Sequence, residues 1–382
     1  MERVHSLNFR RIEWCCEQGG ITPDQLASDV AISASTMQRA MRGGDVLTPS
    51  QLRKIASYFG RGVLFFLESS AADESKVYTA QFRTLANQKP HLSTKVKQVI
   101  QRAERQRAIY LSLREDLDDE ERLRFLPPKI RGLDPRAAAA VARTWLRVKD
   151  ERTFDEYRAV VEARGLLVFR SNGYSGKWQI PKDNPILGFS LYDAECPLIV
   201  VKKQAAETRQ TFTLMHELGH VLLHKASSID DEADLYSREG HEREANAFAG
   251  YLLVPDERLA AINDAERPED VSQYDVWLEP QRAAWGVSGE VILRRLLNTR
   301  RLSDAQYNAY KKWRSATVGA QEDIGNRMYR HREPKHIFGD TFVRTVLDAL
   351  NAHQITLARA SNYLDSLKIA DLHQLERHYA DH

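Results

Sequence analysis

Two histidines and a glutamate near the middle of the chain have the spacing of a metal-binding helix. Residues 212–224 read Phe-Thr-Leu-Met-His-Glu-Leu-Gly-His-Val-Leu-Leu-His, so that His216, Glu217 and His220 form the pattern H-E-x-x-H. Side chains four residues apart lie on one face of a helix, and the two histidines can therefore bind one metal ion. Zinc with two histidines, a third protein ligand and a water molecule is the usual catalytic site, and the metal lowers the pKa of that water. Glu217 would accept the proton, which is the chemistry of metal-assisted amide hydrolysis.

The pattern is specific enough to carry a hypothesis. In a chain of this composition, with 12 histidines, it would arise by chance roughly 0.03 times. Apolar residues recur around it at helical spacing (Leu214, Leu218, Val221, Leu222), which predicts an amphipathic helix with one buried face. Gly219 lowers helix propensity by about 1 kcal/mol, which indicates that another segment approaches closely there. The alternative is a core helix that carries two histidines without a metal.

A third ligand is expected on a second helix downstream. Residues 241–254 carry apolar side chains at helical spacing, and Glu242 lies one turn before Asn246 on the same face. That spacing suits a ligand carboxylate followed by a residue that orients it. Glu244 is the competing candidate, although the helix dipole would also favour an exposed glutamate near a helix start. We predict Glu242 as the ligand, with His224 packed beside the site.

Four segments within roughly residues 135–300 form a recognisable combination. They read Gly-Phe-Ser-Leu-Tyr-Asp, Pro-Leu-Ile-Val-Val, Phe-Thr-Leu-Met-His-Glu-Leu-Gly-His and Glu-Arg-Glu-Ala-Asn-Ala-Phe-Ala-Gly-Tyr-Leu-Leu-Val-Pro. The combination resembles the ImmA/IrrE family of bacterial and phage zinc metallopeptidases. The resemblance implies a minimal zincin fold, a gluzincin-like peptidase with one Zn²⁺ per chain, and regulated cleavage of a repressor or antitoxin-like protein. Carried over to this chain, the ligands are His216, His220 and Glu242, and the base is Glu217.

The N-terminal segment 7–67 predicts several short helices around a tight turn. Thr22 would cap one helix with Pro23 at its first position, and Ser33 would cap the next helix. The segment resembles the phage-repressor (Cro/repressor, XRE-type) helix-turn-helix family. That resemblance implies that Ser33 touches phosphate and that Ser35 and Arg39 contact base edges in the major groove. The complete set of DNA-facing residues it implies is Ser33, Ser35, Thr36, Arg39 and Arg42.

Two features of this segment depart from the family. Ala31 stands at the turn position that is often glycine, where a left-handed backbone carries a modest penalty. Residues 1–67 are also close to charge-neutral, whereas many DNA-binding domains are basic. A helical module that binds protein instead of DNA is therefore the alternative.

A basic block follows the N-terminal segment. Residues 76–114 contain nine lysines and arginines, Lys76 among them, against the single acid Glu104. The block could lie along a phosphate backbone. It could equally be a solvated helix face that pairs with the acidic run at 115–121, and the sequence leaves both open.

The rest of the chain predicts a mainly α fold with a small β-sheet (α+β). Buried strands are expected at 166–169, 186–191 and 198–201, a basic, aromatic-containing loop within 303–336, and two amphipathic helices within 340–367. We expect four regions: a helix-turn-helix domain at 1–70, a helical basic linker at 71–130, a zincin domain at 131–302 and a helical C-terminal region at 303–382.

Composition excludes several classes of protein. The chain has 382 residues, a net charge of +2 and no apolar run near the about 18 residues of a membrane helix. Its N-terminus lacks an apolar signal core. Its three cysteines are odd in number and lie outside C-x-x-C spacing, so a disulfide framework is not indicated. We expect a cytoplasmic protein with no membrane partner.

These features together predict a DNA-associated zinc endopeptidase. Its partners would be a repressor or antitoxin-like protein substrate and a DNA operator, and the sequence leaves open whether the chain forms a homodimer. One alternative is a transcription regulator whose metallopeptidase fold senses a ligand or partner without proteolysis. Another is an antitoxin-like protein that acts by binding a toxin.

Overall fold

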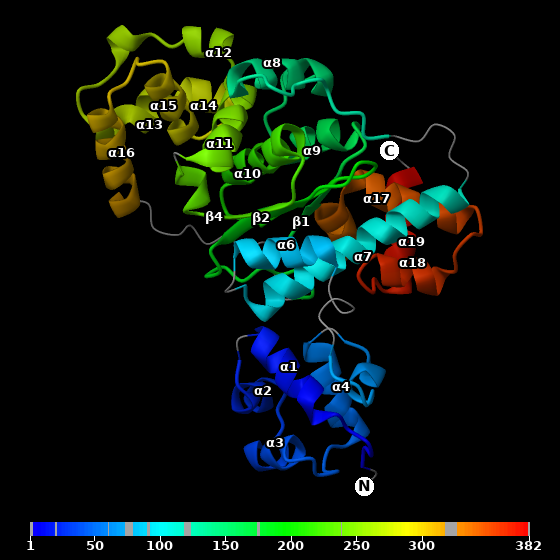
Figure 1. The fold of residues 1–382 in the computed structure, drawn as a ribbon. Coiled ribbons are helices and arrows are strands. Elements are labelled where there is room, and N and C mark those ends of the chain that lie inside the picture. Colours follow the sequence, from blue (N-terminus) through cyan, green and yellow to red (C-terminus); the bar gives the residue numbers. More distant parts are fainter. Residues whose placement is uncertain are drawn as a thin grey trace. The chain divides into compact units, whose positions relative to one another are not determined.

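Two compact units, Met1–Arg102 and Ala103–His382, divide the chain. The structure is a computed structural model, and it describes residues 3–19, 21–59, 61–72, 79–89, 92–117, 124–173, 176–237, 239–317 and 327–380 (Figure 1). The expected division into four regions is finer and stays a prediction. Among the described helices, none combines the length and the apolar character needed to cross a membrane.

The first unit is built from short helices. These are α1 (Phe9–Gly19), α2 (Pro23–Asp29), α3 (Ala34–Met41), α4 (Pro49–Tyr58), the 3-10 turn η1 (Val63–Phe66) and α6 (Ala80–Gln88), and α7 (Thr94–Asp116) begins in this unit. The apolar faces of α1–α4 and η1 enclose one core, in which Ile12, Leu26, Met37, Leu52 and Ile55 are fully or almost fully buried. Lys76 and part of the acidic run, 118–121, lie outside the described residues.

The α2–α3 pair begins and turns where the sequence predicts. Thr22 forms a capping box with Gln25, and Pro23 takes the first helical position. Ser33 caps α3 by accepting a hydrogen bond from the backbone N–H of Thr36. Between the helices, Ala31 has φ +51°, in the left-handed region. The turn is therefore made by a residue that carries a modest conformational cost.

A four-stranded mixed sheet is the centre of the second unit. Its strands are β1 (Leu167–Arg170), β2 (Ile186–Leu191), β3 (Leu198–Val201) and β4 (Ser228–Asp231), in the spatial order β1-β3-β2-β4. β1 runs parallel to β3, and the β2–β3 and β2–β4 pairs are antiparallel. The predicted α+β class is confirmed. The sequence did not predict β4, because Ser-Ile-Asp-Asp has neither the apolar run nor the alternation of a strand.

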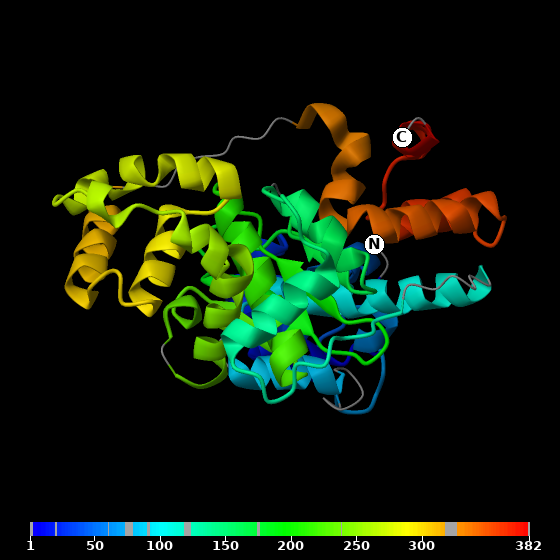
Figure 2. The same cartoon turned by 90° about the horizontal axis from the view of Figure 1, so that it is seen from above.

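Helices surround this sheet. They and the short turns between them are α8 (Pro135–Leu146), α9 (Phe154–Glu162), α10 (Glu207–Gly219), the π-helical turn η2 (His220–His224), η3 (Asp234–Tyr236), α11 (Gly240–Leu253), α12 (Asp256–Ala260), η4 (Asp264–Glu266), η5 (Val271–Gln273), α13 (Tyr274–Trp277), α14 (Glu279–Trp285), α15 (Gly289–Asn298), α16 (Asp304–Thr317), η6 (Arg327–Arg332), α17 (Glu333–Asn351), α18 (Leu357–Tyr363) and α19 (Ile369–Ala380). Helices α8–α11 cover one face of the sheet, and α12–α16 and α17–α19 lie on opposite sides of this core (Figures 1 and 2).

The strands are buried on both faces. Val168, Ile199 and Val201 join the core that contains Leu214 and Met215 of α10. On the other face, Phe169 packs edge-on against Phe338 and Phe342 of α17. Alternate side chains of β1 therefore hold two separate helical layers, as the period of a strand requires.

Residues 303–336 were expected to form a loop, and that prediction is wrong for the part that α16 covers. Asp304–Thr317 is helical, and its residues Tyr307 and Tyr310 are buried against the domain core. The basic and aromatic composition reflects one buried and one solvated helix face, since aromatic rings at positions three apart share a face.

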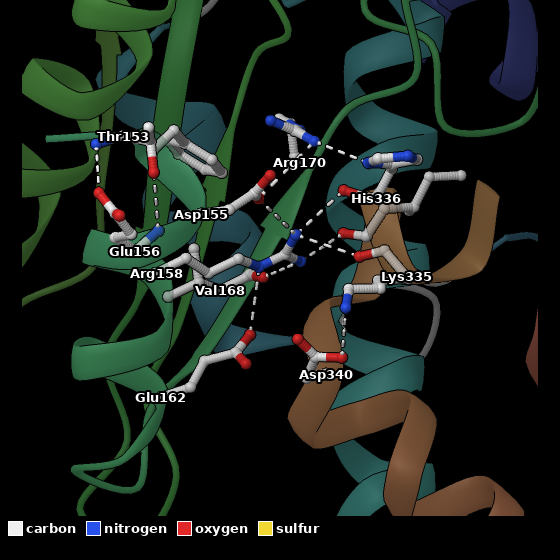
Figure 3. Close-up of polar contacts among 12 residues, drawn as sticks. Thr153, Asp155, Glu156, Arg158, Glu162, Val168, Arg170, Lys335, His336 and Asp340 are labelled. Atoms are coloured by element: carbon white, nitrogen blue, oxygen red, sulfur yellow. Dashed lines mark hydrogen bonds and ion pairs between the residues drawn. The ribbon is translucent and has the colours of Figure 1, made fainter. Parts of the chain in front are cut away.

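A buried ion pair attaches α17 to α9 and β1 (Figure 3). The Arg158 guanidinium donates hydrogen bonds to the backbone carbonyls of His336 (3.0 Å), Ile337 (2.9 Å) and Val168, and its Nε lies 3.2 Å from Glu162 Oε1. Glu162 in turn accepts a hydrogen bond from the backbone N–H of Thr341, 3.3 Å away. The pair thus satisfies the backbone on both sides of a kink in α17, which lies at Gly339 with φ +79°.

Gly339→Ala should destabilise the second unit more than Gly132→Ala does. Both glycines have a left-handed backbone (φ +79° and +81°), but a Cβ at Gly339 would collide with Glu162 Oε1, whereas nothing lies within 4 Å at Gly132. Backbone strain should lower the free energy of unfolding by about 1–2 kcal/mol in Gly132→Ala. In Gly339→Ala the clash should lower it by about 1–3 kcal/mol more. Urea unfolding followed by tryptophan fluorescence measures both free energies of unfolding. Equal decreases in the two variants would contradict the prediction, because they would show that Glu162 moves aside without loss of stability.

Candidate functional site

Helix α10 and the turn after it carry the H-E-x-x-H residues into the interior. Every residue from Gln210 to Gly219 is buried, and the His216 and His220 side chains are 0% and 3% exposed. The close approach expected at Gly219 is made by α11, because an added Cβ would lie 3.2 Å from Ala245 Cα. The helix continues past Gly219 as a π-helical turn, a feature often found at functional sites.

Four side chains converge at this point with their donor atoms close together. The Nε2 atoms of His216 and His220 lie 3.1 Å apart, and Glu242 Oε2 lies 3.3 and 3.4 Å from them. Asp230 Oδ2 lies 3.6 Å from each of the same two nitrogens. All four donor atoms are within 4.8 Å of one another.

This donor set fits a zinc ion. Bonds of about 2.0–2.2 Å from zinc to nitrogen and oxygen imply donor–donor edges of about 3.3–3.6 Å in a tetrahedron. Five of the six donor–donor distances are 3.1–3.6 Å, and the sixth, between Asp230 and Glu242, is within 4.8 Å. Two imidazoles and two carboxylates are also donors that zinc accepts. A divalent cation would offset the cost of burying carboxylates together, which is high when they are left uncompensated.

Glu244, the competing candidate, lies outside this donor set. Its Oε2 is 3.0 Å from His224 Nε2, and His224 Nδ1 is 3.1 Å from His220 Nδ1. When His220 uses Nε2 toward a metal, its Nδ1–H can donate to His224 Nδ1, and His224 Nε2–H can donate to Glu244. Burial lowers the pKa of His224 to about 4, which suits the neutral form this chain needs. A carboxylate that orients a metal-binding imidazole in this way is common, here with one histidine interposed.

Glu217 lies beside the cluster, in space that is open because residue 188 is a glycine without a side chain. It is fully buried, and a Cβ added to Gly188 of β2 would lie 2.9 Å from Glu217 Oε1 and 2.8 Å from Thr213 Cγ2. Burial, and then the negative charge of Asp230, raise the pKa of Glu217 well above its usual value, while the Ser190 hydroxyl opposes the rise. Its ionisation therefore depends on positive charge nearby.

The pKa values of the candidate ligands His216 and Glu242 are shifted in opposite directions. Burial alone would lower the pKa of His216, but hydrogen bonding to Asp230 and Glu242 and the charges of these carboxylates raise it to about 9. Burial alone would raise the pKa of Glu242, but His216 and His220 hold it far below its usual value. Without a cation, the site thus holds a proton on imidazole and a charge on carboxylate.

Asp230 is the residue that sequence reasoning missed. It lies on the unpredicted strand β4, its side chain is 1% exposed, and Ser228 Oγ lies 3.2 Å from both of its carboxylate oxygens. A signal was available in the pair Asp230–Asp231 shortly after the H-E-x-x-H segment, since acidic residues directly after apolar Ile229 are unusual in a buried segment. A single sequence does not separate that signal from an acidic loop.

A hollow with about 480 Å³ of empty volume, its open mouth included, lies beside the N-terminal half of α10. The start of β2, the N-terminal half of α10, η3 and the start of α15 line it, with Leu187, Phe212, Thr213, Tyr236, Val291 and Arg294 among its walls. Phe212 also stacks on His216, with ring centroids 6.5 Å apart. The walls of the hollow are therefore mainly apolar, with Arg209, Glu290 and Arg294 as charged residues among them, and Phe212 connects them to the candidate ligand His216.

The residues implied to face DNA lie on α3 and its flanks. Ser33, Ser35, Arg39 and Arg42 are exposed, and Thr36 is half-buried. Ser33 Oγ caps the helix and donates to Thr36 Oγ1 at 2.8 Å, so this hydroxyl is used within the turn. The exposed face of α3 therefore carries Arg39, and Arg42 follows directly after the helix.

Comparison with known proteins supports the peptidase reading of the second unit. Residues 179–297, which include the whole donor set, match the family model of the IrrE N-terminal-like domain, peptidase family M78. The chain is also 40% identical over 83 residues to "Uncharacterized immunity region protein 2" of Bacillus phage phi105. That match covers 21% of this chain and 52% of the phage protein, so the chain spans about half the length of this relative.

The fold and the site define a metallopeptidase-like domain. A small mixed sheet, an H-E-x-x-H helix and a second helix with a carboxylate beside the histidines are its parts. More particularly, residues 179–297 are similar to the IrrE N-terminal-like domain, and the His/Asp/Glu group within them could hold a metal ion. The individual roles of His216, Glu217, His220 and Glu242 stay predictions.

Glu242→Ala should lose the metal, whereas Glu244→Ala should keep it. Glu242 contributes a donor atom to the cluster, but Glu244 acts on His220 through His224. We expect one zinc per chain in the wild type, loss of zinc on dialysis of Glu242→Ala, and an affinity lowered about 10- to 100-fold in Glu244→Ala. Elemental analysis and chelator competition measure these values. Loss of zinc in Glu244→Ala alone would instead assign the ligand to Glu244.

Proposed function

We propose that the chain is a DNA-associated, zinc-dependent endopeptidase that cleaves a repressor or antitoxin-like regulatory protein. One observation carries the proposal: His216, His220 and Glu242 present donor atoms with tetrahedral spacing, and a buried glutamate follows the first histidine. A site that only held the fold together would have no chemical need for Glu217 beside the metal. The match of residues 179–297 to a peptidase family supports the same reaction class.

The chain's own residues supply the proton transfers. Zinc held by His216, His220 and Glu242 would acidify water, polarise a peptide carbonyl and supply the positive charge that favours ionised Glu217. Glu217 then takes a proton from the attacking water and returns it to the leaving amine. Burial excludes bulk water from its carboxylate, and Gly188 leaves the space in which that carboxylate lies.

Two features suit a protein substrate. β4 lies at the edge of the sheet next to the donor set, and an extended peptide can add to such an edge by main-chain hydrogen bonds. A substrate side chain would enter the hollow beside Thr213 and Phe212. Its walls favour an apolar side chain, because Leu187, Leu235 and Val291 join Phe212 there.

The regulatory role is supported by the first unit and by the phage relative. α2 and α3 form two capped helices around a left-handed Ala31, and α3 exposes Arg39 and Arg42. A helix with this exposure can enter the major groove of an operator. The phage protein is named as an immunity region protein. We infer that DNA binding brings the peptidase to a regulated promoter.

A second candidate is a transcription regulator that uses the metallopeptidase fold without proteolysis. Asp230 favours it, because four protein donors resemble a structural zinc site more than a catalytic one. The two functions differ in what they require of Glu217. A proteolytic regulator needs its base, whereas a sensing module needs only the metal ligands.

Glu217→Gln should keep the zinc and lose the regulatory effect. Glutamine fills the same volume but accepts no proton, so the rate of cleavage should fall about 10²- to 10⁴-fold. The measurement compares new protein N-termini, by mass spectrometry, in cells that express wild type or the variant, with zinc content as the control for folding. An unchanged regulatory response in Glu217→Gln would favour the sensing module.

Arg39→Ala should weaken sequence-specific DNA binding by about 1–3 kcal/mol. The reason is that Arg39 is exposed on α3 and would contact a base edge. Arg53→Ala, which removes an exposed arginine from α4, is the matched control and should have a smaller effect. Fluorescence anisotropy with DNA selected by the wild type from a random pool measures both. Selection of no preferred sequence would point to a protein-binding module.

A further inference from the structure

The donor set contains one protein group more than a catalytic zinc site needs. Three protein ligands leave the fourth position to water or substrate. In this chain Asp230 Oδ2 lies at 3.6 Å from Nε2 of both His216 and His220, edges that a zinc tetrahedron accommodates. Its side chain is more deeply buried than that of Glu242, at 1% exposed against 24%.

We propose that Asp230 is a fourth metal ligand that closes the site, so that the resting chain is a latent peptidase. The inference rests on the proposed function of the metal centre. A metal with four protein ligands has no free position for the water or the substrate carbonyl on which hydrolysis depends. Activity then requires Asp230 to leave the metal while His216, His220 and Glu242 stay.

The strand that carries Asp230 is built in a way that allows this movement. β4 has four residues and lies at the edge of the sheet, where it pairs with β2. Its register with β2 is irregular between Ile186 and Gly188. Such irregularities re-aim side chains and are common beside active sites. The other three donors, by contrast, lie on α10, on the turn that continues it and on α11, which pack against each other.

The position of β4 also links the fourth ligand to the substrate surface. Gly188, the register partner of Asp230, is the residue that leaves room for Glu217. A few residues past Asp230, Leu235 and Tyr236 of η3 line the hollow beside the site. A protein that pairs with β4 or fills the hollow therefore acts on the segment that holds Asp230. Substrate or partner binding would displace the carboxylate and open the metal.

The test uses metal affinity and an exogenous ligand, with no need of a substrate. Full-length wild type, Asp230→Asn and Asp231→Asn are loaded with Co²⁺, whose visible spectrum reports its coordination, and are titrated with acetohydroxamate. Asp231→Asn removes the same charge from the neighbouring position, whose side chain points to the other face of the strand. Zinc affinity of each protein is measured by chelator competition.

The proposal expects a wild-type spectrum that acetohydroxamate leaves unchanged. Asp230→Asn should bind zinc on the order of 10- to 100-fold more weakly, and acetohydroxamate should shift its cobalt spectrum. Asp231→Asn should behave as the wild type does.

A shift of the wild-type spectrum by acetohydroxamate would overturn the closed site and leave the metal centre standing. Unchanged zinc affinity in Asp230→Asn would do the same. Absence of metal binding by the wild type would instead sink the proposed function together with this inference. Because the wild-type titration decides by itself, the test holds even if Asp230→Asn does not fold.

Discussion

The gathering of three carboxylates, two buried and one partly buried, around two imidazoles is the constraint on which the second unit depends. Glu217, Asp230 and Glu242 surround His216 and His220, and such a group is costly inside a protein unless positive charge compensates it. The opposite pKa shifts of Glu217 and Glu242 show how the protein alone distributes that cost. A cation at the common point of the donors would offset that cost. The elements around the site serve to hold this arrangement together.

Close backbone approach is the means by which the arrangement is held. Gly219 lets α11 come near enough for Glu242 to meet the two histidines, and Gly188 lets β2 pass beside Glu217. A side chain at Gly219 would meet the Ala245 backbone, and one at Gly188 would meet Thr213 and Glu217, at about contact distance or less. The geometry of the site therefore depends on these two glycines. Further from the metal, Arg158 and Glu162 satisfy the kinked backbone of α17, which closes the other face of the sheet. The site and α17 thus pack against opposite faces of the same sheet.

Sequence reasoning succeeded where a residue's partner lies on the same regular element. Helical spacing predicted the α10 and α11 segments, and apolar runs predicted β1, β2 and β3. It failed for β4, because the pairing of this strand with β2 is a tertiary contact that the local sequence Ser-Ile-Asp-Asp does not predict. The same limit hid the contact of Glu244 with His224, since these residues lie on different elements. The predicted loop within 303–336 failed because the buried face of α16 was read as part of a basic stretch.

The residue that sequence reasoning missed is also the one that separates the two readings of the site. A closed set of four protein donors favours retention of the metal, whereas hydrolysis needs an open position. One chain can meet both demands only if one donor is held less firmly than the others. His216, His220 and Glu242 lie on packed helical segments, but Asp230 lies on a short edge strand with an irregular register. The difference in how the donors are anchored, more than their identity, would then decide when the site acts.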